Sequence, residues 1–169
     1  MESSEIREAI NRAVSYLSEH PTEAKYVDSA ATAVLERGLQ VRVTGPDGVV
    51  VTTDMPTSVG GGGGLPSPGW LLRAAQASCL ATLIAMRAAT NGQRLRRIEV
   101  VVDSESDDRG ILGMDDSVPA GPLSSRARVR VEADGIPRKD LEALVRASDA
   151  HCPVQDAVRR AIPCTVELA

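Results

Sequence analysis

Three cysteines, Cys79, Cys152 and Cys164, are the residues of this 169-residue chain best suited to covalent chemistry. The first ten residues, MESSEIREAI, lack the basic and then apolar order of a secretory signal, so we expect a cytoplasmic protein. A reducing cytoplasm disfavours structural disulfides, so pairing among these cysteines would be transient and catalytic. The question is therefore which cysteine is a reagent and which is packing.

The letters HCPVQDAVRRAI predict a helix that begins beside the second cysteine. Pro153 suits the first helical position, which places Cys152 at the N-cap, facing the positive end of the helix dipole. A thiol in that position is expected to have a lowered pKa. We interpret the neighbouring His151 as polar surface, and we expect Cys164 to be packing.

Cys79 lies inside a long apolar, alanine-rich segment, SPGWLLRAAQASCLATLIAMRAATNG. Ser67 can cap this helix, Pro68 suits its first position, and the Asn-Gly at 91 to 92 ends it. Taken alone, such a cysteine is more often a small hydrophobic residue than a nucleophile. Small or apolar residues on nearly every side require the helix to be surrounded. With one Trp, two Tyr and no Phe, two chains surround it more easily than one, which predicts a homodimer.

The remaining patterns predict one α+β domain after an N-terminal helix. Strand-like alternation, turn residues and helical spacing mark the successive elements, and the strand pair is expected to be antiparallel. The expected order is a helix ending at His20, one or two strands over 30–43, a turn at 45–48, a strand over 49–55, the long helix over 67–91, a strand over 95–106, a polar loop, a strand over 124–135, helices over 137–150 and 151–162, and a final strand over 164–169.

Several other functions are excluded by charge and spacing. A net charge of −4 argues against nucleic acid, and Arg94, Arg96 and Arg97 form too short a basic cluster to reverse this. Charged residues interrupt the apolar run 71–89, so no membrane span is predicted. The acids between 103 and 116 do not have calcium-loop spacing, and no metal site is expected. The glycine run 60–64 lacks a phosphate-loop motif and is interpreted as a flexible loop.

The segment GGLPSPGWLLRAAQASC, followed much later by HCPV, resembles the OsmC/Ohr family of osmotically inducible and organic hydroperoxide resistance proteins. That family is identified by a Pro-x-x-Leu-Leu-x-x-Ala-x-x-x-Cys helix start and a later Cys-Pro at a helix start, and both occur here in order. The resemblance covers residues 29–169, so we divide the chain into a helical extension, 1–28, and an OsmC-like domain, 29–169. It implies curved antiparallel sheets around a central cysteine-bearing helix, in an intertwined homodimer.

The resemblance also implies a function. The family's peroxidatic cysteine maps to Cys79 and its resolving cysteine to Cys152, so the expected activity is a thiol-dependent reduction of organic hydroperoxides. A sulfenic acid on Cys79 would condense with Cys152 to a disulfide, which a lipoyl-type or small dithiol would reduce. The resemblance implies no metal and no organic cofactor. An arginine from the N-terminal hairpin, Arg42 or Arg37, would stabilise the thiolate.

One departure from the family pattern keeps a second function open. Family members carry Pro-Glu-Glu or Pro-x-Glu after the helix start, and that glutamate pairs with the arginine. Here Gly69 and Trp70 stand in its place, so the acid is missing and Trp70 is expected to line the substrate pocket. The alternative is an OsmC-like protein without fast peroxidase activity that binds a small apolar or electrophilic ligand in the same interface pocket.

Overall fold

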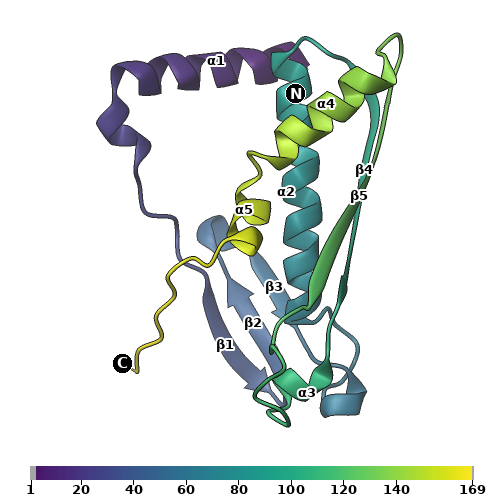
Figure 1. Ribbon diagram of the computed structural model, residues 1–169. Coiled ribbons are helices and arrows are strands. Elements are labelled where there is room, and N and C mark those ends of the chain that lie inside the picture. The colour runs from purple at the N-terminus through teal and green to yellow at the C-terminus, as the bar shows by residue number, and fades with distance from the viewer. Residues whose placement is uncertain (1–2, 169) are drawn as a thin grey trace. The chain divides into compact units, whose positions relative to one another are not determined.

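The computed structural model describes residues 3–168, which form two groups of elements: residues 3–13 with 75–168, and residues 14–74. Each group is described by itself, and helices α1 and α2 run from one into the other. Figure 1 labels the helices and strands. They are α1 (Ser3–Glu19), β1 (Thr32–Arg37), β2 (Gln40–Thr44), β3 (Val50–Thr53), α2 (Pro68–Thr90), β4 (Leu95–Glu105), α3 (Asp108–Ile111), β5 (Ser124–Ala133), α4 (Arg138–Asp149) and α5 (Pro153–Arg159).

Residues 14–74 contain an antiparallel sheet in the order β1-β2-β3. Gly38 has a φ of 57°, a conformation that glycine adopts at no steric cost, and it turns β1 into β2. The predicted turn closes through a hydrogen bond from the Gly45 N–H to the Val49 carbonyl at 2.9 Å, and β3 follows. The segment predicted as one or two strands is therefore two strands, and the predicted turn leads into the third.

The glycine run after β3 is folded around a buried carboxylate. Asp54, only 1% exposed, accepts hydrogen bonds from the N–H groups of Met55 at 2.7 Å and Gly62 at 3.0 Å. The amide of Gln40 donates a third bond at 3.4 Å. The Met55 N–H is the largest cause that holds the pKa of Asp54 below its usual value. The run forms no helix or strand, as expected, and the Gly62 N–H ties it to Asp54.

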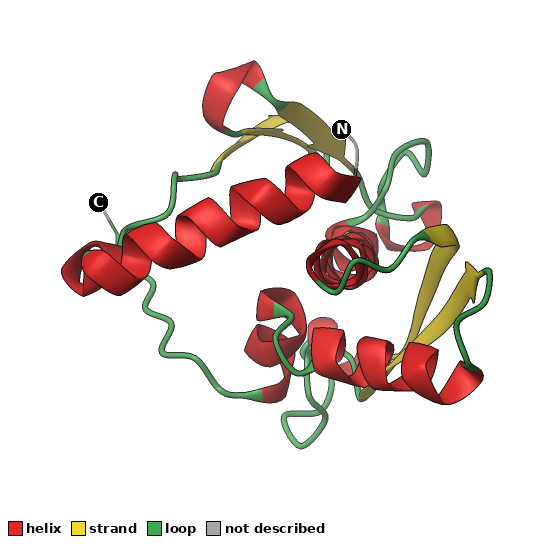
Figure 2. Ribbon diagram, turned by 90° about the horizontal axis from the view of Figure 1, so that it is seen from above, coloured by secondary structure: helices red, strands yellow, loops and turns green. Residues whose placement is uncertain are grey.

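In the other group, the predicted strand pair is confirmed. Strands β4 and β5 pair antiparallel from Leu95 opposite Ala133 to Glu105 opposite Ser124. Figure 1 shows this ribbon running alongside α2, and Figure 2, which looks down α2, shows α4 and α5 beside the same helix. Apolar side chains that alternate along both strands, among them Val100 and Val129, pack against the α2 core residues. The predicted helices over 67–91, 137–150 and 151–162 are confirmed as α2, α4 and α5.

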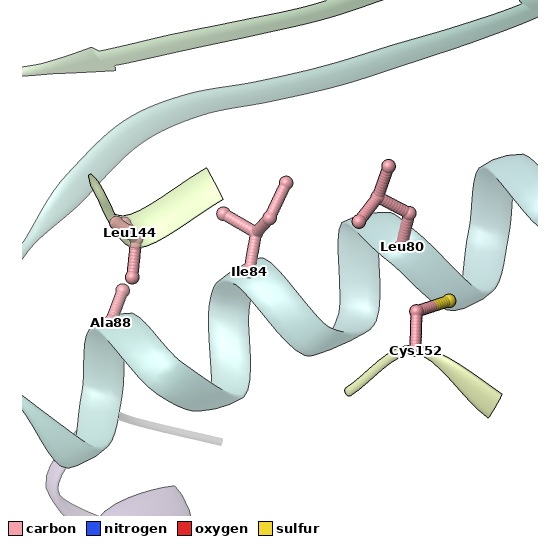
Figure 3. Packing of buried hydrophobic residues seen from close by; sticks show 5 residues of the cluster. All are labelled: Leu80, Ile84, Ala88, Leu144 and Cys152. Carbon is pink, nitrogen blue, oxygen red and sulfur yellow. The ribbon is translucent and has the colours of Figure 1, made fainter. Parts of the chain in front are cut away.

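Helix α2 supplies the centre of the core. Leu80, Ile84 and Ala88 recur at every fourth position and pack with Leu144 of α4 and with Cys152 (Figure 3). By length and composition alone α2 is apolar enough to cross a membrane. Leu80, Ile84 and Ala88 on one face of α2 nevertheless lie in the core cluster, packed with side chains of β4, β5 and α4.

The predicted C-terminal strand over 164–169 is wrong for the residues that the structure describes. Residues 161–168 form no strand, and the side chains of Val166 and Leu168 are fully exposed. The alternating pattern is present, but a strand exists only when a neighbour pairs with it, and the described chain offers none to this segment. The proposed domain boundary at residue 28 stays a prediction.

Candidate functional site

The N-terminus of α2 is fixed as predicted. Pro68 is the first helical residue, and the Ser67 hydroxyl accepts a hydrogen bond from the Trp70 N–H at 3.2 Å. A capped first turn sets the register of the helix, so it determines which face each later side chain occupies. Cys79 then follows half-buried, directly before the core residue Leu80.

Cys152 occupies the predicted N-cap position of α5. Pro153 is the first residue of that helix, and the Cys152 carbonyl accepts the Asp156 N–H at 2.9 Å. The side chain of Cys152 is 0% exposed and packs onto α2 beside Leu80 (Figure 3). The turn between α4 and α5 therefore carries this thiol into the core.

The two cysteines that the sequence singled out are brought together. Cys79 packs against the core cluster that contains Cys152, and its proximity raises the pKa of the Cys152 thiol. Neither is in a disulfide, so both are free thiols in the same packed region. Two thiols in one packed region are candidates for a disulfide, because cross-linking requires close sulfur atoms.

The expected lowering of the Cys152 pKa is wrong. Burial is the largest effect and raises it, and the contact with Cys79 raises it further. The backbone N–H groups of Gln155 and Val154 at the start of α5 lower it, but by less. Desolvation disfavours the thiolate more than the helix terminus favours it, so Cys152 is a protonated thiol at neutral pH.

The candidate arginines lie in the group formed by residues 14–74. The Nε of Arg42, on β2, donates to the carboxylate of Glu36 on β1 at 2.5 Å. Arg37, at the end of β1, contributes to lowering the pKa of Asp54. A role for either arginine beside Cys79 stays a prediction.

Trp70 lines a hollow at the start of α2. Its side chain is 51% exposed, and the other lining residues come from the glycine-run loop and the first turns of the helix. The hollow has a volume of about 350 Å³ and is lined by Pro56, Gly63, Leu65, Pro66, Ser67, Trp70 and Arg73. The surface that it offers is mainly apolar, with one cation at its edge.

Two further expectations concern residues near the cysteines. His151 is surface, as predicted: it is exposed, and its Nδ1 lies 2.9 Å from the Ala147 carbonyl oxygen. Cys164 is not packing, because it is exposed in the C-terminal segment. Among residues 3–168, no cluster of three His, Cys, Asp or Glu side chains could hold a metal ion.

Asp54 is the structural residue that the sequence analysis missed. It holds the loop that forms one side of the Trp70 hollow, through its bonds to Met55 and Gly62. The sequence signal for this role of Asp54 is an acid a few residues before a glycine run, since glycines leave backbone N–H groups accessible to an anion.

The sequence and the fold were compared with those of known proteins. The model of the OsmC family, described as OsmC-like protein, matches residues 60–167, more than half of the chain. No curated protein is similar enough in sequence to match.

Solved structures share the fold at low identity. An organic hydroperoxide resistance protein from Legionella pneumophila is 22% identical, with 80% of this chain and 91% of that one covered and a TM-score of 0.59. The organic hydroperoxide resistance protein OhrB of Bacillus subtilis is 23% identical over 79% and 91%, with a TM-score of 0.52. An OsmC-like protein from Mycoplasma pneumoniae is 12% identical over 80% and 89%, with a TM-score of 0.68. The family model and these α+β structures together show that the chain belongs to the OsmC/Ohr family.

Proposed function

We propose that the protein is a thiol-dependent peroxidase that reduces organic hydroperoxides through Cys79 and Cys152. The observation that carries the proposal is that a half-buried Cys79 packs against the core cluster that contains the fully buried Cys152. The two sulfur atoms have unequal environments, which is what a nucleophile and its resolving partner require.

The reaction has three balanced steps. The Cys79 thiolate attacks one oxygen of ROOH; the O–O bond breaks, ROH leaves after taking up a proton, and Cys79 becomes a sulfenic acid. The Cys152 sulfur then attacks the Cys79 sulfur, a disulfide forms and water leaves. A dithiol reduces the disulfide by exchange and is itself oxidised to a disulfide, which restores both thiols.

The division of roles follows from burial. Cys152 is protonated and inaccessible, so it is a poor first nucleophile toward a hydroperoxide arriving from solvent. It becomes useful after Cys79 is oxidised, because it lies in the core cluster against which Cys79 packs. Arg42 or Arg37 is proposed as the cation that favours the Cys79 thiolate.

The proposed assembly is a homodimer in the cytoplasm. Apolar side chains that a single chain leaves exposed support it: Val34 and Leu35 on β1, Val50 on β3, and Leu72 and Met86 on α2. A second copy of the chain would bury side chains of this kind, as an interface does. Light scattering at low micromolar concentration should give twice the chain mass of 17.8 kDa, and a monomer would contradict the assembly.

Steady-state turnover tests the activity. Cumene hydroperoxide with a dithiol as reductant should be consumed faster than hydrogen peroxide. Cys79→Ser should abolish consumption, and Cys152→Ser should permit one equivalent of oxidation but no sustained turnover. Cys164→Ser is the matched control, because Cys164 is exposed and lies outside the core cluster that holds the other two cysteines, and it should leave the rate unchanged. An unchanged rate in Cys79→Ser would refute the proposal.

A second candidate function is supported by Trp70. The hollow that this side chain lines has a mainly apolar surface suited to a small ligand. Gly69 and Trp70 stand where the family pattern quoted above has acids. In this alternative, the protein binds a small apolar or electrophilic molecule and has no fast peroxidase activity.

The variant Trp70→Glu separates the two candidates. If the protein is a peroxidase, an acid at position 70 should raise the rate by pairing with Arg42 or Arg37 as the family pattern implies. If it is a binding protein, quenching of the single tryptophan by an apolar ligand should be saturable in the wild type, and the wild type should show no turnover.

A further inference from the structure

A groove between β5 and α4 takes no part in the proposed reaction. It has a volume of about 470 Å³, within the range of small-molecule sites. Its lining contains no cysteine and no residue of α2. The lining residues are Val129, Arg130, Val131, Arg138, Leu141, Glu142, Val145 and Arg146.

The floor of the groove is apolar. Val129 and Val131 of β5 and Val145 of α4 are half-buried and also pack against the core. Leu141 is half-buried one turn before Val145, so the two side chains lie on the same face of α4. These four side chains form a continuous hydrocarbon surface that stays partly open to solvent.

The rim of the groove is positively charged. Three arginines and one glutamate line it, and the glutamate is already bound, since the Arg138 Nε donates to Glu142 at 2.9 Å. Arg130 likewise pairs with Glu132 at 2.8 Å. The guanidinium of Arg146 has no ion pair with any residue in the described part of the chain, so it is the cation available to a ligand.

We propose that this groove binds an amphipathic anion, a straight-chain carboxylate of the fatty-acid type. Its alkyl chain would lie on Val129, Val131, Leu141 and Val145, and its carboxylate would bind Arg146. Arg138 and Arg146 are eight residues apart on α4, so the groove is about 12 Å long, a length suited to a medium-chain acid. The proposal does not rest on the peroxidase reaction, because no cysteine takes part.

Titration with decanoate, followed by NMR of labelled Val and Leu methyl groups, tests the proposal on the full-length protein. Methyl signals of Val129, Val131, Leu141 and Val145 should shift and saturate, with weaker binding at higher salt. Acetate, which lacks the chain, and decanol, which lacks the charge, should bind more weakly. Arg146→Gln should weaken decanoate binding about threefold to tenfold, as for a partly solvated ion pair.

Lys139→Gln is the matched control, because Lys139 is exposed on the same helix, carries the same charge and does not line the groove. It should change the affinity by less than about twofold. Equal weakening by both substitutions would overturn the proposal in favour of diffuse charge attraction. Shifts confined to methyl groups around Cys79 would overturn it as well. Groove signals that move with protein concentration and not with decanoate would instead identify an interface between copies of the chain.

Discussion

Replacing Ile84 by alanine tests how α2 supports the cysteine pair. Ile84 is 0% exposed and packs with Leu80, Leu144 and the rest of the core cluster (Figure 3). Removing three buried carbon atoms from such a site costs about 3 kcal/mol of unfolding free energy, because transfer and cavity terms add. At about 2 to 4 °C per kcal/mol for a chain of this size, Tm should fall by roughly 6 to 12 °C.

The cavity left by Ile84→Ala should also loosen the packing around Cys79 and Cys152. Ile84 lies next to Leu80 in the packing that also holds Cys152, so loosening it should increase the alkylation rate of Cys152 relative to Cys79. Urea unfolding followed by circular dichroism at fixed protein concentration gives the free energy, and mass spectrometry of iodoacetamide-labelled peptides gives the rates. Thr82→Ala, at an exposed position of α2, is the control and should stay within about 0.5 kcal/mol. A loss below about 1 kcal/mol for Ile84→Ala would refute the assignment of α2 as the core helix.

Three further predictions concern the fold. The pKa of Asp54 is lowered in the folded state, so its contribution to the free energy of unfolding is complete above the unfolded value of about 3.9 and is lost as pH falls through the lower folded value. Asp54→Asn should therefore lower Tm at pH 7 and flatten the acid limb of a plot of Tm against pH. An unchanged acid limb would contradict this role of Asp54. A Cβ on Gly61 would lie 1.8 Å from the Met55 carbonyl oxygen, so Gly61→Ala should lower Tm by several degrees. Gly64→Ala is the control and should change Tm little, because a Cβ there meets nothing within 4 Å. Equal Tm values for the two variants would be evidence against the close approach at Gly61. Deleting residues 1–28 should leave 29–169 folded and soluble, which circular dichroism checks, and loss of soluble protein would make the N-terminal helix integral.

Much of the fold could be predicted because its signals are local. Ser67 and Pro68 mark the start of α2, and the alternation around Val129 and Val131 marks β5; both signals depend only on near neighbours in sequence. The placement of Cys152 before Pro153 is equally local, and it correctly predicted the N-cap position.

The errors arose where a property depends on distant segments. The pKa of Cys152 is decided by burial against α2, which a helix-start motif does not reveal. The residues from Cys164 onward alternate like a strand, but alternation does not supply a pairing partner. The binding of the glycine run to Asp54 was likewise hidden, because glycines in sequence do not show which anion their N–H groups meet.

The most direct test of the cysteine pair is peptide mass spectrometry after treatment with one equivalent of cumene hydroperoxide. We expect an intramolecular Cys79–Cys152 disulfide that a dithiol reverses, and, in Cys152→Ser, a Cys79 sulfenic acid that excess peroxide converts to the sulfinic acid. If Cys79 remains a free thiol while Cys152 or the exposed Cys164 is oxidised instead, Cys79 is core packing and the peroxidase proposal is wrong.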